Sequence, residues 1–446
     1  MKKIVAWTIG IVLVLGTGVG WYQYQKLSSR IIRITPEFIR ELNQAVAAQD
    51  ETAFKIPEPR QRTLQAPNPL KNVYFGDLHV HTALSFDSYL FGNRVTLDEA
   101  YRFAHGEMIR NAAGESMQIT VPLDFVAITD HAESFGLFEI CSDETIGEDQ
   151  REFCNQFENP STTFYWKLRK KALNRPPRRE AVLCGEDGAI CFEQGKNTWA
   201  TIQKAAEKYN QPGVFTAFNA YEYSPVIRNG GMLHRNVIFR NPTVPNFAVS
   251  FYDAPTVLDL WRILEETCTG DCEFLTIIHN MNYSWGLSYA GETIDGDPYT
   301  TADWSLRGRS EPLAEIFQIK GSSEAAFGVG ATDEDCAFEQ FFPPCEADET
   351  GKCIPPNSMA RDGLKRGLEL KETLGFNPLQ FGFIGATDTH NGNPGDTEEW
   401  DFRGQNALYS APAKKRLTDA IYPSTKNPGG LTCIWAEENT RDALFD

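Results

Sequence analysis

Two histidines one residue apart, His79 and His81, follow a short apolar run from Val73 to Phe75. On an extended backbone, residues i and i+2 point to the same side, so both imidazoles leave one face of the chain where this run ends. Imidazole nitrogens are common ligands of transition-metal ions. The spacing indicates a metal site, although a His-x-His pair alone does not distinguish such a site from an ordinary surface feature.

The other histidines strengthen this interpretation. The chain has seven, and three more close apolar, strand-like runs: His131, His279 and His390. His234 instead opens such a run, N-V-I-F, and His105 lies in a helical pattern, where we interpret it as a helix-surface residue. The alternative is that the six histidines other than His105 are core residues bonded to the backbone. In that case each of the six would have to lie beside an apolar run by chance.

Carboxylates occupy similar positions. Glu222 ends the run G-V-F-T-A-F-N-A-Y-E, and Asp388 precedes His390 by two residues. Zinc usually takes three protein ligands and keeps one open position, so this set is too large for one ion and predicts two or three. Mixed imidazole and carboxylate ligands suit zinc, manganese or iron. Neighbouring ions of this kind activate water and clamp the oxygens of the attacked centre, which makes hydrolysis the natural reaction class.

Strand-like and helix-like segments alternate after residue 70, which predicts an α/β fold with a mostly parallel sheet or barrel. In a (β/α) barrel, catalytic groups lie where strands end. The predicted strands are Val73–Phe75, Phe125–Ile128, Val214–Tyr221, Asn236–Phe239, Leu275–Ile278, Glu315–Ile319 and Phe381–Ile384. The predicted helices are Leu97–His105, Thr198–Tyr209, Thr256–Thr267 and Ala360–Leu374. Two long insertions, residues 139–197 and 323–357, are expected to form lids or side flaps around the site.

The N-terminus predicts a membrane anchor. Two lysines precede an uncharged run from Ile4 to Tyr22, close to the roughly 17 to 25 residues that cross a bilayer. The lysines predict a cytoplasmic N-terminus, and no clear cleavage site follows, so we expect an uncleaved anchor over residues 1–25. A stalk with a Pro-rich linker then spans residues 26–70, and residues 71–446 form the main domain, periplasmic or extracellular.

Ten cysteines fit an oxidising compartment. Their spacing suggests local disulfides, which are Cys141 with Cys154, Cys184 with Cys191, Cys268 with Cys272, and Cys336 with Cys345 or Cys353. No paired C-x-x-C spacing is present, so we assign the cysteines to structure and not to metal.

The net charge of −18 disfavours binding of a nucleic-acid polymer, which needs an excess of Lys and Arg. A local basic pocket for a small anion remains open. Lys320 follows a predicted strand, Arg235 follows His234, and Arg228 lies just upstream, so these three cations are candidates for contacts to a phosphate. No obligate protein partner is evident.

The ordered motifs resemble the PHP superfamily, the metal-dependent phosphoesterases named for polymerase and histidinol phosphatase. They run D-L-H-V-H-T-A-L-S-F-D, I-T-D-H, then Glu222, His234, H-N at His279 and D-T-H at His390, over roughly Asn72 to Asn393. Segments such as A-Y-E-Y-S-P and G-A-T-D-T-H-N-G look like an exported branch of unknown function.

The resemblance implies a distorted (β/α)7 barrel whose members often carry three metals. It places His79, His81, Glu222 and Asp388 in a more buried binuclear part, completed by His131, His234, His279 and His390. Where many members have a third histidine after the H-x-H, this chain has Ser85-Phe86-Asp87, which makes Asp87 the candidate ligand. Asp130, beside His131, is either a further ligand or, as we prefer, a residue that orients an imidazole.

Two alternatives stay open. Amidohydrolase-type enzymes also begin with H-x-H, but typically bridge their metals with a carboxylated lysine and end on a lone aspartate, whereas this chain has Glu222 and Asp388-x-His390. Activity on an ester or lactam would favour that class over a phosphoesterase. The other alternative is a metal-binding protein without turnover, whose metal sites would be closed to water and substrate.

Overall fold

The computed structural model describes residues 60–159, 162–346, 349, 351–398, 401–410, 416 and 427–446. The predicted anchor, residues 4–22, and nearly all of the predicted stalk lie outside these ranges. Within the described residues, no helix has the length and apolar character that crossing a bilayer requires.

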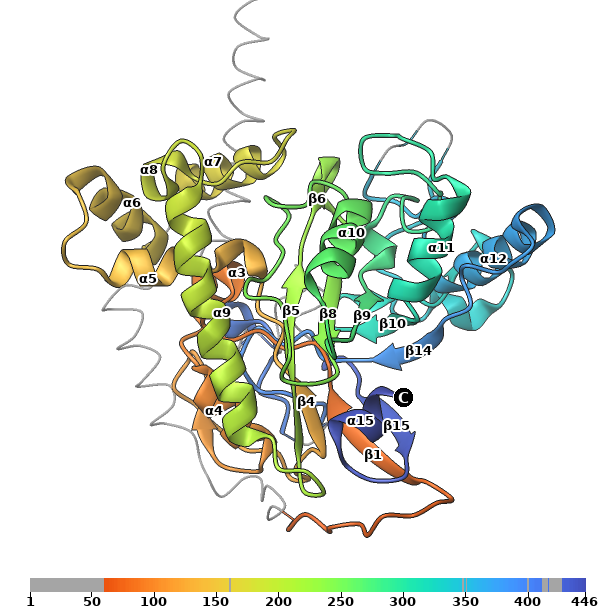
Figure 1. Ribbon diagram of the computed structural model, residues 1–446, viewed down its shortest axis with the longest axis horizontal. Helices are drawn as coiled ribbons and strands as arrows, with labels where there is room; N and C mark the ends of the chain where they lie inside the picture. Colours follow the sequence, from red (N-terminus) through yellow and green to blue (C-terminus); the bar gives the residue numbers. More distant parts are fainter. Residues whose placement is uncertain are drawn as a thin grey trace, which may run out of the picture.

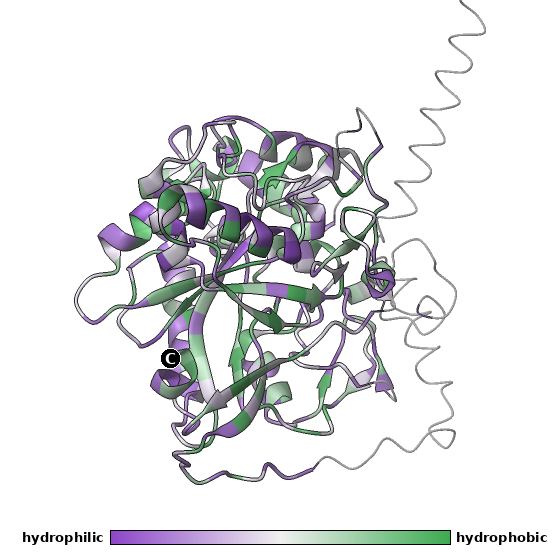
Figure 2. Ribbon diagram, turned by 90° about the vertical axis from the view of Figure 1, so that its right-hand side faces the viewer, coloured by the Kyte–Doolittle hydropathy of each residue, from purple (hydrophilic) through white to green (hydrophobic). Residues whose placement is uncertain are grey.

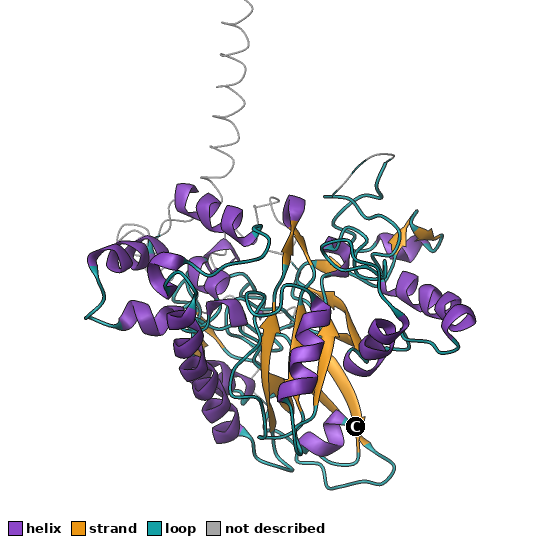
Figure 3. Ribbon diagram, turned by 45° about the horizontal axis from the view of Figure 1, so that its top comes forward, coloured by secondary structure: helices purple, strands orange, loops and turns teal. Residues whose placement is uncertain are grey.

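The fold is mixed α/β and is built around a curled, half-barrel sheet of nine strands (Figure 1). Helices lie around the strands, as Figure 3 shows from another direction. In spatial order the strands are β11 (Gly321–Ser322), β10 (Leu313–Gln318), β9 (Phe274–Ile278), β8 (Arg235–Phe239), β5 (Thr216–Tyr223), β4 (Phe125–Ala127), β1 (Asn72–Asp77) and β15 (Thr432–Ala436), while β14 (Gly382–Gly385) pairs with β10. All seven predicted strands coincide with strands of this sheet, and β11 and β15 are additional.

Strand β8 runs against its neighbours. The pairs β1–β4, β4–β5, β9–β10 and β10–β14 are parallel, whereas β8 is antiparallel to both β5 and β9. Its first residue, Arg235, therefore lies opposite Tyr223 and Ile278, which are the last residues of β5 and β9. This reversal explains why His234 precedes its strand and still reaches the edge where the other histidines follow theirs.

The two ends of the curled sheet approach each other at this same edge. Beyond β1 and β14, Val80 forms a parallel bridge with Thr389. The backbone N–H of Asp388 donates to the carbonyl of His79 at 2.9 Å, and that of His81 donates to Thr389 at 2.9 Å. The first and last histidine motifs are therefore joined through their backbones.

Alternation along the strands separates two apolar layers. Side chains from β1, β4, β5, β8, β9 and β14 meet in one cluster inside the curl: Tyr74, Phe125, Phe218, Ile238, Ile277 and Ile384. The opposite faces of the strands pack against helices through residues such as Trp199 and Trp261. Figure 2 shows hydrophobic residues concentrated on the strands and hydrophilic residues along the outer helices.

The outer helices include α4 (Leu97–Ala104), α9 (Ala189–Tyr209), α10 (Val257–Thr267), α11 (Thr301–Ser310), α12 (Ala360–Leu374) and α15 (Arg441–Phe445). The N-caps Thr96, Thr256 and Thr300 each form a capping box with an acidic residue three positions later. Each box satisfies two backbone N–H groups that a helix start would leave unpaired. The four predicted helices are present, and α9 begins earlier than predicted.

The first insertion is helical. It contains α5 (Leu137–Ser142), α6 (Glu148–Glu158), α7 (Thr162–Ala172), α8 (Ala181–Cys184) and the first turns of α9. In Figure 1 these helices lie together at the upper left, near the site end of the sheet. The predicted disulfides Cys141–Cys154 and Cys184–Cys191 are confirmed and tie this layer together.

The second insertion holds short strands β12 (Ala326–Phe327) and β13 (Gly330–Ala331) and a 3-10 turn, Glu334–Ala337. Here the prediction that Cys336 forms a disulfide is wrong. Cys345 pairs with Cys353, which leaves Cys336 as a buried free thiol. The predicted Cys268–Cys272 disulfide is confirmed.

Candidate metal centre

Glu222 lies at the middle of a buried group of imidazoles. Its Oε1 is 2.6 Å from Nδ1 of His234 and 3.1 Å from Nε2 of His279. Its Oε2 is 3.4 Å from Nε2 of His79 and 3.3 Å from Nε2 of His81. Because residues two apart on a strand share a face, Glu222 points into the curl together with Phe218 and Ala220, as His234 does with Ile238 and His279 with Ile277.

A second group lies next to the first and shares His81. Nε2 of His390 is 3.0 Å from Oδ2 of Asp87, and Nε2 of His131 is 3.3 Å from the same oxygen. Nε2 of His81 is 3.0 Å from Oδ1 of Asp388. All nine predicted ligand residues therefore come together at one edge of the sheet.

Sequence reasoning missed Glu315. This fully buried carboxylate on β10 places Oε2 at 2.9 Å from Nδ1 of His79. A charged residue within the apolar run L-A-E-I-F is costly to bury unless it is paired, and this cost is the signal that could have identified it.

Burial and mutual charge set the protonation of the group. Burial lowers the pKa of His279 to about 3, and the neighbouring His79 adds to this effect. Burial alone would raise the pKa of Glu222, but the imidazoles of His131, His234 and His279 hold it well below its usual range. Burial opposes charge on His131, yet Glu222 and Asp87 outweigh it and raise the pKa of His131 to about 10. The facing carboxylates thus favour positive charge, and the imidazole of His131 and the ammonium of Lys320 supply it.

The residues fit divalent metal ions. Four overlapping sets have ligand atoms that all lie within 4.8 Å of one another: His81, Asp87, His131 and His390; His79, His81 and Glu222; His79, His279 and Glu315; and His131, Glu222 and His234. Within the described residues, Nε2 of His234, Nδ1 of His279 and Oε2 of Glu222 are buried and have no hydrogen-bond partner. Buried polar atoms are rarely left unpaired, and imidazole nitrogen with carboxylate oxygen suits zinc, manganese or iron.

Asp130 acts on a different imidazole from the one beside it in sequence. Its carboxylate accepts hydrogen bonds from the backbone N–H and hydroxyl of Thr82 and from the hydroxyl of Ser85, each at 2.7 Å. The Ser85 oxygen in turn lies 2.8 Å from Nδ1 of His81. Asp130 therefore fixes His81 through Ser85, and its own oxygens already have three donors.

Lys320 reaches the cluster. Its ammonium forms an ion pair with Oδ2 of Asp388. Burial alone would lower the pKa of Lys320, but the charge and hydrogen bond of Asp388 outweigh it and raise the pKa. Lys320 is therefore a fixed positive charge beside the carboxylate cluster.

The structure does not bring Arg235 or Arg228 to the cluster. Arg235 follows His234 directly, so its side chain leaves the opposite face of β8 and packs near Trp261 of α10. There its Nε lies 2.9 Å from Oε2 of Glu311, and both side chains are buried. The prediction that Arg235 contacts a substrate phosphate in catalysis is therefore corrected, because its guanidinium is held in an ion pair with Glu311 on the opposite face of β8. Arg228 is exposed on the turn between β6 (Val226–Ile227) and β7 (Gly231–Met232).

Fold and site together define a mixed α/β protein with a buried His, Asp and Glu cluster that could bind metal ions. The chain belongs to the DUF3604 family, described as a protein of unknown function, whose model matches residues 68–446. No curated protein sequence matches the chain.

One solved structure is distantly similar. It is a two-domain protein containing a predicted PHP-like metal-dependent phosphoesterase from Bacteroides vulgatus ATCC 8482, with 12% sequence identity and a TM-score of 0.35. The similarity covers 86% of this chain and 65% of that chain, so this chain spans less than two thirds of that protein.

Proposed function

We propose that this protein is a metal-dependent phosphoesterase of the PHP type with two or three divalent ions. The observation that carries the proposal is the meeting of His79, His81, Glu222 and Asp388 with five further nitrogen and oxygen ligands at one edge of the sheet. The order of the motifs along the chain supports it. The distorted (β/α)7 barrel of that superfamily is supported by the ring of β1, β4, β5, β8, β9, β10 and β14, with the Val80–Thr389 bridge between its ends.

When bound, such ions would lower the pKa of water and offset the charge on the phosphate oxygens. In the overall reaction the bond between phosphorus and the ester oxygen breaks, the water oxygen joins phosphorus, and a water proton passes to the leaving alcohol. Glu222, whose two oxygens lie 2.6 Å from Nδ1 of His234 and 3.4 Å from Nε2 of His79, would be one of the residues that hold the ions. Lys320 would hold a phosphate oxygen, because its ammonium has three donors and Asp388 engages only part of them.

Partial exposure marks where a substrate enters. The side chains of Asp87 and Lys320 are 24% and 20% exposed, and that of His234 is 10% exposed. The other predicted ligands are at most 4% exposed. A substrate phosphate would therefore approach between Asp87, His234 and Lys320.

The four disulfides indicate an oxidising, extracellular compartment. We further propose that residues 4–22 anchor the protein to the membrane and that its substrate is a small phosphorylated molecule outside the cytoplasm. The acidic net charge of −18 supports a small anionic substrate over a nucleic-acid polymer.

The test is the double substitution His79→Ala with His81→Ala, with His105→Gln as the control, because His105 is the histidine outside the cluster. Metal content is measured after purification without chelators, and hydrolysis is measured on phosphate monoesters, phosphodiesters, carboxylic esters and amides. We expect the double variant to lose both metal and phosphatase activity, and the control to keep both.

Three outcomes would contradict the proposal. Full metal content or full activity in the double variant would remove the cluster from the reaction. Activity confined to carboxylic esters or amides would favour the amidohydrolase alternative. Bound metal without hydrolysis of any substrate would favour a metal-binding role without turnover.

A further inference from the structure

A cavity of about 260 Å³ lies beside the metal cluster, between the helices of the first insertion and the β6–β7 hairpin. Most of its lining is apolar, with Phe86, Leu137, Phe153, Phe157, Leu168 and Met232 among its walls. Ligand pockets in proteins have this character, with an apolar body and a few polar groups that set orientation. The proposed phosphoesterase chemistry does not by itself account for this cavity.

The cavity shares a wall with the cluster. Phe86 lines the cavity and immediately precedes Asp87, and its ring centroid is 5.2 Å from that of His131. On the other side, Met232 lines the cavity two residues before His234. Asp87 and His234 are two of the three most exposed members of the site, so the cavity adjoins its entrance.

Aromatic contacts and disulfides hold the cavity in shape. Tyr89, on the same short helix α3 (Phe86–Leu90) as Asp87, packs at 4.8 Å on Phe138 and at 5.5 Å on Phe157 of the insertion. Cys184 and Cys191, which form one of the disulfides of the insertion, also line it. A preformed pocket binds a ligand with less loss of conformational entropy.

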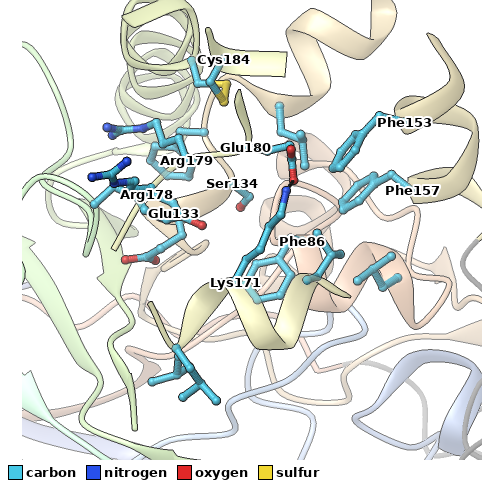
Figure 4. Close-up of a pocket in the computed structure, with 18 of the residues that line it drawn as sticks. Phe86, Glu133, Ser134, Phe153, Phe157, Lys171, Arg178, Arg179, Glu180 and Cys184 are labelled. Atoms are coloured by element: carbon cyan, nitrogen blue, oxygen red, sulfur yellow. Dashed lines mark hydrogen bonds and ion pairs between the residues drawn. A yellow bond between two sulfur atoms is a disulfide. The ribbon is translucent and has the colours of Figure 1, made fainter. Parts of the chain in front are cut away.

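Two arginines lie at the side opposite the aromatic wall. Figure 4 shows Phe153 and Phe157 on one side of the cavity and Arg178 and Arg179 on the other. Arg179 is paired with Asp253 at 2.8 Å, and Lys171 is paired with Glu180. Arg178 is exposed and has no ion-pair partner within the described part of the chain. The cavity therefore combines an apolar body with a margin of charged groups of both signs, which include Arg178, Glu133 and Glu180.

We propose that this cavity binds the leaving group of the substrate and selects phosphate esters of aromatic alcohols. The inference rests on the proposed function and names the substrate class of that site. With the phosphate between Asp87, His234 and Lys320, the ester oxygen faces Phe86 and the group attached to it enters the cavity. Aromatic walls favour edge-to-face and offset contacts with a ring, and the volume suits a small ring system better than a long acyl chain.

The test uses Leu168→Trp, which fills the cavity from α7, and Lys170→Trp, which adds the same side chain at an exposed position of that helix. Substrates are 1-naphthyl phosphate and phenyl phosphate, whose alcohols have similar acidity. Binding of 1-naphthol, which needs no metal, is followed separately by fluorescence.

We expect native protein to favour the naphthyl ester in kcat/KM by about tenfold, since one added apolar group in a pocket discriminates on this scale. Leu168→Trp should remove this preference and weaken 1-naphthol binding about tenfold, while Lys170→Trp changes neither. If native protein hydrolyses no ester but binds 1-naphthol in a manner that Leu168→Trp abolishes, the phosphoesterase proposal fails and the cavity remains a site for aromatic groups. If 1-naphthol does not bind native protein, or if Leu168→Trp leaves both binding and preference unchanged, the inference is overturned.

Discussion

Nδ1 of His79 lies 2.9 Å from Oε2 of Glu315, although 236 residues separate them in the chain. The contact directs the other ring nitrogen, Nε2, toward the cluster, where it lies 3.2 Å from Oδ1 of Asp388. A carboxylate that accepts a hydrogen bond from one imidazole nitrogen fixes the tautomer and raises the basicity of the other nitrogen. In the proposed metal site, Glu315 would therefore prepare His79 to bind an ion through Nε2.

Replacing this carboxylate tests its role. We expect Glu315→Gln to lower the affinity for the metal by about tenfold, since partners that orient a metal-binding histidine contribute on this scale. Affinity is measured by competition with a chelator. The exposed Glu292→Gln is the control and should bind metal like the native protein. An unchanged affinity in Glu315→Gln would show that His79 needs no such support.

A substitution of Lys320 tests anion binding separately from metal binding, because Lys320 carries a positive charge and is not a predicted metal ligand. Lys320→Met should raise the inhibition constant for inorganic phosphate about tenfold, since it removes an ammonium that can contact a phosphate oxygen. Metal content should not fall, because the change also frees Asp388 from its ion pair. The exposed Lys204→Met is the matched control. Equal inhibition of both variants and native protein would remove Lys320 from the anion site.

Arg235 should contribute to the stability of the fold and not to phosphate binding at the site. Its ion pair with Glu311 is buried, and breaking a buried pair typically costs about 3 to 5 kcal/mol in the free energy of unfolding. In Arg235→Met we expect the free energy of unfolding to fall by an amount near the lower end of this range, because Glu311 keeps its ion pair with Arg307 at 2.7 Å. Denaturant unfolding measures the loss. The control is Arg262, which is 51% exposed and pairs with Asp303, and Arg262→Met should cost less than about 1 kcal/mol. A large loss of phosphate affinity at native stability would instead return Arg235 to the site.

The sequence was most informative where apolar residues are concentrated in runs of strand length. Each of the seven strands named from such runs is present, because burial in the sheet demands that pattern. It was least informative in the first insertion. Helix α6 has the sequence E-D-Q-R-E-F-C-N-Q-F-E and buries only Cys154 and Phe157. A helix held by the disulfide of Cys154 and by the buried side chain of Phe157 needs no long apolar stripe, so its pattern resembles a polar loop.

Which site residues could be predicted from the sequence depended on where they lie on their strands, because successive side chains of a strand point to opposite faces. The predicted ligands stand at strand ends, where position alone brings them together. Glu315 lies inside β10, and its direction is known only once the pairing of β10 with β9 and β14 is known. Arg235 shows the converse, because alternation alone indicates that the neighbour of an inward-facing His234 faces outward.

Asp396 predicts a pH dependence of stability that is separate from the metal centre. This carboxyl is buried and accepts a hydrogen bond from Nδ2 of Asn393 at 2.8 Å. Burial raises the pKa of Asp396 from 3.8 to about 7, with help from the charges of Glu398 and Asp401, while the hydrogen bond from Asn393 and the charge of Arg403 oppose the rise.

The direction in which stability changes with pH follows from the numbers of protons bound by the folded and unfolded states. Between pH 4 and 7, roughly, the folded state holds a proton that the unfolded state has lost, so this group destabilises the fold increasingly as pH rises and fully above about pH 7. At about 1.4 kcal/mol for each pKa unit, the full effect is about 4 kcal/mol. Asp396→Asn stays neutral, and its amide oxygen can accept the bond from Asn393. Its free energy of unfolding, relative to native protein, should therefore rise between pH 5 and pH 8, whereas the exposed Asp271→Asn should show no such trend. A difference between Asp396→Asn and native protein that is the same at both pH values would mean that Asp396 ionises normally in the folded protein.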